Sequence, residues 1–141
     1  MSNEGKPSVA EHKRLTHDGA TRIIAAAVAK AEAMGIPQCI AVVDDGGNLL
    51  AFLRMDGAKF LSIESSIHKA VTAASLRVPT GSMSAEVDIK LAVTTGGKLV
   101  NLKGGVPIAV DGQVIGGIGV GSGTGDQDLE VAKAGLAAVS G

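Results

Sequence analysis

The chain has 141 residues, of which 20 are glycine, with two Phe, no Trp or Tyr, and a net charge of −1. Apolar residues make up 45% and charged residues 19%, which excludes a disordered chain, and no Gly-X-Y period indicates collagen. Interspersed charges and missing aromatic rings exclude a typical nucleic-acid surface. No apolar run approaches the length of about 18 residues that a membrane span needs, so we expect neither a membrane partner nor a signal peptide.

The first helix and the first hairpin follow a polar leader over residues 1–14, which we expect to be flexible. Thr16 is suited to cap a helix that Gly35 ends. Two β-prone runs, 39–44 and 49–55, flank an Asp-Gly-Gly turn and predict an antiparallel hairpin whose faces are both covered. The apolar stripe of the helix comprises Ala20, Ile23, Ile24, Ala27, Ala31 and Met34.

A second helix is predicted over residues 62–77, and Pro79 helps to end it. A shorter helix is predicted over 84–93. The expected buried side of the longer helix comprises Ile63, Ile67, Ala70, Val71 and Ala74.

The last part of the chain predicts three strands and a helix. Residues 98–102 form one candidate strand, and 106–110 and 113–120 form a hairpin around an Asp-Gly turn. Asp126 is expected to cap a final helix. Its expected inner face comprises Leu129, Ala132, Leu136 and Val139. The order of these elements predicts one α+β domain over 15–141, with a five-stranded, mainly antiparallel sheet.

Eleven of the 20 glycines lie between Gly96 and Gly125. The alternating glycines from Gly117 to Gly123 match neither the GxGxxG nor the P-loop pattern, so a standard nucleotide site is not predicted. Glycines within a strand are typical of close approach by another backbone or a ligand. We therefore expect a ligand or a second subunit to pack against this segment. Because small side chains bury little area, self-association is expected to add to the core.

Several polar residues are candidates for function. His12 and His17 flank the start of the first helix and are expected to be solvated. Glu64, His68 and Thr72 share one helix face, which either lines a pocket or is an ordinary solvated face. The sequence predicts no metal site, because no Cys/His cluster is present.

Arg54, Asp56 and Lys69 follow one another from a strand end through a loop to a helix. Such a group either binds a carboxylate, such as a propionate, or forms a surface ion-pair cluster. The lone Cys39 lies in an apolar strand and is expected to be buried and unreactive. A single cysteine suits a reducing compartment, so a cytoplasmic location is expected.

Several blocks of the sequence are recognisable together: residues 41–58, 69–74, 104–108 and 116–120, with Asp128 and the following 132–136 block. Together they resemble the GlcG/HbpS-type family, which includes the PduO C-terminal domain. The resemblance extends over about residues 15 to 140. It implies a three-layer α/β/α fold of the profilin or PAS kind, assembly into dimers or larger homo-oligomers, and, for several members, binding of haem or a related tetrapyrrole.

The resemblance makes a homo-oligomeric small-molecule-binding protein, with haem as the expected ligand, our leading hypothesis. His68 or His17 would ligate the iron, and Arg54 and Lys69 would pair with the propionates. The alternative is a hydrolase, isomerase or lyase acting on a small carboxylate at a subunit interface. In that enzyme Arg54 or Lys69 would anchor the substrate, and His68 or Glu64 would act as acid or base.

Overall fold

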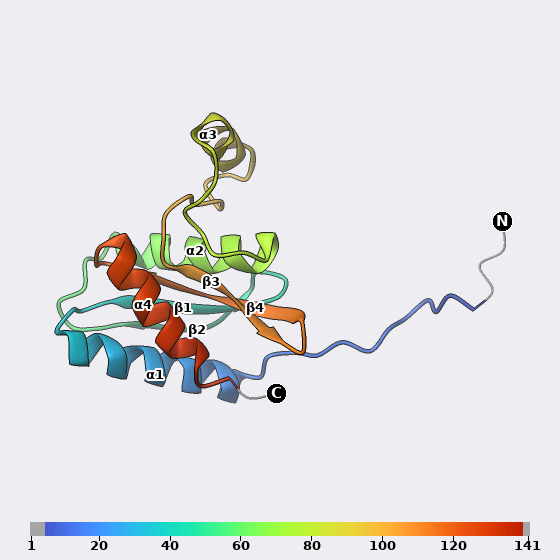
Figure 1. Ribbon diagram of the computed structural model, residues 1–141, viewed down its shortest axis with the longest axis horizontal. Coiled ribbons are helices and arrows are strands. Elements are labelled where there is room, and N and C mark those ends of the chain that lie inside the picture. Colours follow the sequence, from blue (N-terminus) through green and yellow to red (C-terminus); the bar gives the residue numbers. More distant parts are fainter. Residues whose placement is uncertain (1–4, 140–141) are drawn as a thin grey trace.

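The computed structural model describes residues 5–139 and contains four helices and four strands in these residues. A four-stranded antiparallel sheet, in the order β2-β1-β4-β3, forms the middle layer. Helix α2 covers one face of the sheet, and helices α1 and α4 cover the other (Figure 1). The α+β class and the three-layer arrangement are therefore confirmed. The elements are α1 (His17–Met34), β1 (Cys39–Asp44), β2 (Leu49–Arg54), α2 (Ser62–Leu76), α3 (Ala85–Thr94), β3 (Gly105–Val110), β4 (Gln113–Gly121) and α4 (Gly125–Leu136).

The ends of α1 are those that its sequence predicts. The Thr16 side chain accepts a hydrogen bond from the Gly19 amide at 3.0 Å, and Gly35 closes the helix in the left-handed conformation with φ 70°. The apolar stripe on α1 faces the sheet and α4, and five of its six predicted residues are buried. Met34 is half-buried at the edge of the same cluster.

The predicted fifth strand, residues 98–102, is wrong. This segment is a loop, because side chains of α2 and of the loop that follows α2 form hydrogen bonds with the backbone groups that a strand would need. The Thr72 hydroxyl donates to the Lys98 carbonyl and accepts from the Val100 amide. The Thr80 hydroxyl donates to the Leu102 carbonyl. The sheet consequently ends at β3.

We expected Asp126 to cap α4, and this prediction is wrong. The cap is Thr124, whose side chain accepts a hydrogen bond from the Gln127 amide, while the Gln127 side chain accepts one from the Thr124 amide. This reciprocal pair is a capping box, and it places Asp126 in the first helical turn, where its charge favours the helix dipole.

The glycines of β3 and β4 allow α2 to lie unusually close to the sheet. A Cβ atom at Gly119 would lie 1.9 Å from the Ser66 carbonyl oxygen, and one at Gly117 would lie 2.3 Å from that of Ala70. The backbone that approaches these glycines is therefore the chain's own helix, rather than the ligand or second subunit that we expected. The buried face of α2 comprises Ser62, Ser66, Lys69, Ala70, Thr72, Ala73 and Ala74, so the larger Ile63, Ile67 and Val71 are only half-buried.

Helix α3 stands away from the three layers (Figure 1). None of its residues is buried, although Ile89 and Val93 are apolar and expose 69% and 76% of their surface. Two further apolar side chains on this helix, Val87 and Leu91, are also exposed. The described residues contain no helix long and apolar enough to cross a membrane.

Candidate functional site

The predicted polar face of α2 is divided between two environments. His68 Nε2 lies 3.7 Å from a carboxylate oxygen of the exposed Glu64, one turn earlier. Thr72 is buried under the loop that contains Lys98 and Val100, and its single hydroxyl proton is shared between the Lys98 carbonyl and the His68 carbonyl. The three side chains therefore do not line one pocket together: Thr72 fixes a loop, and the His68–Glu64 pair lies on the outer face of α2.

The second predicted cluster, which comprises Arg54, Asp56 and Lys69, is not brought together in the structure either. Arg54 ends the outer strand β2 and is exposed, as is Asp56 in the loop that follows. Lys69 points instead into the protein, where only 5% of its side chain is exposed. None of the cavities described below contains Arg54, Glu64 or His68, so the four groups of the enzyme hypothesis are not brought together within the described chain.

Lys69 forms a buried ion pair with Asp128 of α4. Its Nζ lies 3.1 Å from Asp128 Oδ2 and donates a second hydrogen bond of 2.8 Å to the Val120 carbonyl. The other carboxylate oxygen of Asp128 accepts from the Gly123 amide at 2.9 Å. A Cβ atom at Gly104 would lie 3.0 Å from Lys69 Nζ, so this glycine leaves room for the ammonium group.

The sequence contains a signal for this pair that composition and motif searches miss. Lys69 and Asp128 both fall on the buried stripe of their helices, each four residues before a buried alanine, Ala73 and Ala132 respectively. Opposite charges that interrupt two apolar stripes indicate a partnership, because a buried charge needs a counter-charge.

Two side chains at the end of the leader contact both hairpin turns. His12 Nε2 lies 2.6 Å from an oxygen of Asp45 in the β1–β2 turn, and its Nδ1 is 2.9 Å from the side-chain nitrogen of Gln113. Lys13 forms an ion pair with Asp111 in the β3–β4 turn. These contacts hold the last residues of the leader against one end of the sheet. Beside them lies a cavity of about 730 Å³, which is mainly polar and includes Arg77 on its wall.

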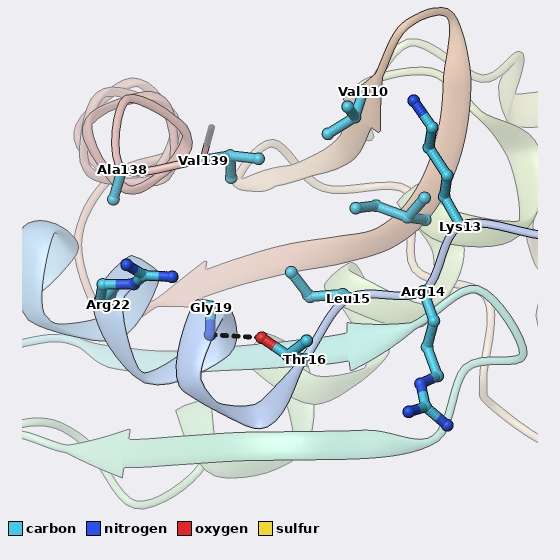
Figure 2. Close-up of a pocket in the computed structure, with 10 residues that line it drawn as sticks. Lys13, Arg14, Leu15, Thr16, Gly19, Arg22, Val110, Ala138 and Val139 are labelled. Carbon is cyan, nitrogen blue, oxygen red and sulfur yellow. Dashed lines mark hydrogen bonds between the residues drawn. The ribbon is translucent and has the colours of Figure 1, made fainter. Parts of the chain in front are cut away.

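A second cavity, of about 380 Å³, lies where the leader enters α1; we call it the α1 cavity (Figure 2). Its wall comes from the first turns of α1, the β3–β4 hairpin and the chain end that follows α4. Three basic side chains lie at its rim, with Arg22 on one side and Lys13 and Arg14 on the other (Figure 2). Its apolar lining comprises Leu15, Val110, Ile115, Ala138 and Val139.

Not all three basic side chains of the α1 cavity form ion pairs with acidic side chains. Arg22 pairs with Asp18 at 3.1 Å, and both side chains are largely exposed, so this contact is weak. Arg14 has no ion-pair partner among residues 5–139. His17, the first residue of α1, is exposed and does not itself line the cavity, although its sequence neighbour Thr16 does. The cavity thus combines an apolar wall with positive charge.

Cys39 is fully buried in β1, as expected. Burial raises the pKa of its thiol, and the opposing effect of the Arg54 charge is smaller. The thiol therefore remains protonated near neutral pH and is a poor nucleophile. In residues 5–139, no group of three or more His, Cys, Asp or Glu side chains is arranged to hold a metal ion.

Comparisons with known proteins agree with the resemblance. Residues 15–137 match the family described as "Haem degrading protein HbpS-like". Protein GlcG of Escherichia coli K12 is 42% identical over 107 residues, which cover 75% of this chain and 80% of GlcG. A crystal structure of HbpS superposes with a TM-score of 0.84 at 36% identity and covers 95% of this chain and 96% of HbpS.

A crystal structure of a PduOC–haem complex superposes with a TM-score of 0.82 at 30% identity, covering 90% of this chain and 96% of that one. The PduO corrinoid adenosyltransferase of Citrobacter freundii is 31% identical over 120 residues, and the match spans only 36% of that protein. Fold and sequence therefore agree over nearly the whole described chain, and the protein belongs to the HbpS-like family.

Proposed function

We propose that this protein binds haem, or a related tetrapyrrole, at the α1 cavity. The observation that carries the proposal is the pairing of an apolar wall with a basic rim in one cavity. A haem has an apolar macrocycle and two propionates, and guanidinium groups bind carboxylates through paired hydrogen bonds. Haem binding by a relative, PduOC, supports the choice of ligand.

His17 is the iron ligand that we favour among the two predicted imidazoles. It begins α1 and follows Thr16 of the cavity wall, whereas His68 lies near Glu64 on the outer face of α2, which covers the opposite face of the sheet. Arg14 and Arg22 would then hold the propionates in place of Arg54 and Lys69. Lys69 is unsuited to that role because it is buried beside Asp128 and does not line the α1 cavity. When bound, the haem iron would supply ligand-binding or redox chemistry.

We propose further that the working form is a homo-oligomer in the cytoplasm. Helix α3 has only ten residues, and isolated helices shorter than about 12–15 residues are marginal in water. Its exposed Ile89 and Val93 therefore need a partner surface, and a second copy of the chain supplies one in every cell that makes the protein. A haem is larger than the α1 cavity, so a second copy would also cover the exposed part of the ring. The lone thiol of Cys39 fits a reducing compartment.

Titration of the full chain with hemin tests the proposal. We expect a saturable Soret shift at one site per subunit, and we expect His17→Ala to change the Soret maximum and to weaken binding by at least about tenfold. The His68→Ala variant is the matched control and should bind as the parent does. Arg22→Ala should weaken binding without moving the Soret maximum. An unchanged spectrum and affinity in His17→Ala would remove His17 from the site, and a non-saturable titration would exclude the proposal as a whole.

A further inference from the structure

A third cavity lies beside the buried Lys69–Asp128 pair. It has a volume of about 380 Å³, and we call it the Lys69 cavity. Lys69 and Asp128 form its inner wall, and Gly123, Gly125 and Lys103 are among the residues that complete it. It shares no lining residue with the α1 cavity.

Stability alone does not account for this ion pair. Removing two charges from water costs several kcal/mol per ion, and well-packed apolar side chains often serve equally well in such a place. The side chains of Lys69 and Asp128 are nevertheless 95% or more buried, in a core that is built mainly from aliphatic residues. Buried charged groups that border a cavity are typical of binding sites.

Several hydrogen-bond donors at this cavity are not fully used. An ammonium group has three N–H bonds, and Lys69 uses two of them, for Asp128 and for the Val120 carbonyl. The amides of Gly125 and Asp126 open α4, and no acceptor for them is found among residues 5–139. Free amides at a helix start favour an anion.

Lys103 adds a second ammonium group at the cavity wall. It lies 2.9 Å from Asp126, but both side chains are more than half exposed, so this pair contributes little and can exchange partners. Asp128 is neutralised by Lys69, and Asp126 is the acidic group that a bound anion would displace from Lys103.

An unsatisfied buried amide lies directly behind the same wall. Gln38 is fully buried, and neither of its side-chain polar atoms has a hydrogen-bond partner among the described residues. A Cβ atom at Gly123 would lie 2.8 Å from Gln38 Nε2 and 3.0 Å from Asp128 Oδ1. A buried amide without a partner costs about 1–3 kcal/mol, so the wall behind the cavity contains unsatisfied polar groups, although Gln38 does not itself line the cavity.

We propose that the Lys69 cavity binds a small carboxylate. Its oxygens accept hydrogen bonds from the ammonium groups of Lys69 and Lys103 and from the first amides of α4. The site requires neither Arg54 nor His68, and it does not depend on haem binding.

Titration of the ¹⁵N-labelled full chain with acetate, at constant ionic strength, tests this site. We expect saturable shifts of the Gly123 and Gly125 amide signals with acetate and none with acetamide, its neutral isostere. The Lys103→Ala variant should weaken acetate binding by at least about fivefold. Lys133→Ala, which removes an exposed lysine from the last turn of α4, should leave the affinity unchanged.

Lys69→Met serves as a second variant, with far-UV circular dichroism as the check on folding. If it folds, it should show no saturable shift; if it does not fold, the Lys103→Ala and Lys133→Ala comparison decides. Shifts that stay linear with acetate concentration, that acetamide reproduces, or that both lysine variants weaken equally would overturn the proposal. The hemin titration is independent of each of these results, because the two cavities have separate linings.

Discussion

Gly119→Ala is expected to destabilise the protein strongly, because it places one methyl group between β4 and α2. The new Cβ would lie 1.9 Å from the Ser66 carbonyl oxygen and 2.5 Å from the Ala70 nitrogen. Both atoms belong to the backbone, so no side-chain rotation relieves the overlap. To reach the 3.4 Å of ordinary contact, the helix would have to move outward by about 1.5 Å at Ser66.

Overpacking a core costs about 1–3 kcal/mol in general. Because α2 contacts three of the four strands, we place Gly119→Ala at the upper end, at about 3 kcal/mol. Typical domains have a free energy of unfolding of about 5–15 kcal/mol, so the effect is large. Urea unfolding followed by far-UV circular dichroism measures it, and with a slope of about 2 kcal/mol/M the midpoint should fall by about 1.5 M.

Gly125→Ala is the matched control. Its Cβ, in the first turn of α4, would lie 3.1 Å from the Lys103 Cβ, an overlap that a shift of a few tenths of an ångström relieves. Alanine is favoured over glycine in helices, so this variant should retain or slightly raise the midpoint. A cost below about 1 kcal/mol for Gly119→Ala, or equal effects of the two substitutions, would refute the close-packing argument.

Three further predictions concern stability and assembly. Lys69→Met should cost about 3–5 kcal/mol in urea unfolding by leaving Asp128 buried and unpaired, and adding Asp128→Leu should recover most of that loss. Burial raises the pKa of the Cys39 thiol above its ordinary value of 9.0, against a smaller opposing effect of Arg54. The contribution of this thiol to the free energy of unfolding should therefore be complete below pH 9.0 and should be lost as the pH rises further. Cys39→Ala should flatten this dependence of the unfolding free energy on pH. Val93→Glu on α3 should shift the protein to a smaller species in sedimentation, whereas an unchanged size would exclude α3 from the interface.

Local signals in the sequence predicted most element boundaries. Thr16 and Gly35 end α1 through hydrogen bonds with nearby backbone groups, and a two-residue Asp-Gly turn joins β3 to β4. These features depend only on residues close in the sequence, so a local pattern predicts them. Residues 98–102 have strand propensity, but Thr72 and Thr80 compete for their backbone groups. That competition depends on side chains about 20 to 28 positions away, which no local pattern reveals.

The buried face of α2 shows a different limit of sequence analysis. Hydrophobicity alone favours Ile63 and Ile67 as the inner residues, but the glycines of β4 leave space only for small ones such as Ser66 and Ala70. The residues of α2 that are buried are therefore determined by β4, the strand against which the helix packs. The candidate site shows the same dependence on distant residues, because the buried partner of Lys69 is Asp128, which comes from the last helix.

The close contact between α2 and β4 also bears on how stability varies with temperature. Backbone atoms and small side chains fill much of this seam, so unfolding exposes less apolar surface there than the opening of an aromatic core of equal size would. The heat capacity change of unfolding follows the apolar surface exposed. We therefore expect a flatter dependence of the unfolding free energy on temperature, with resistance to cold as well as to heat.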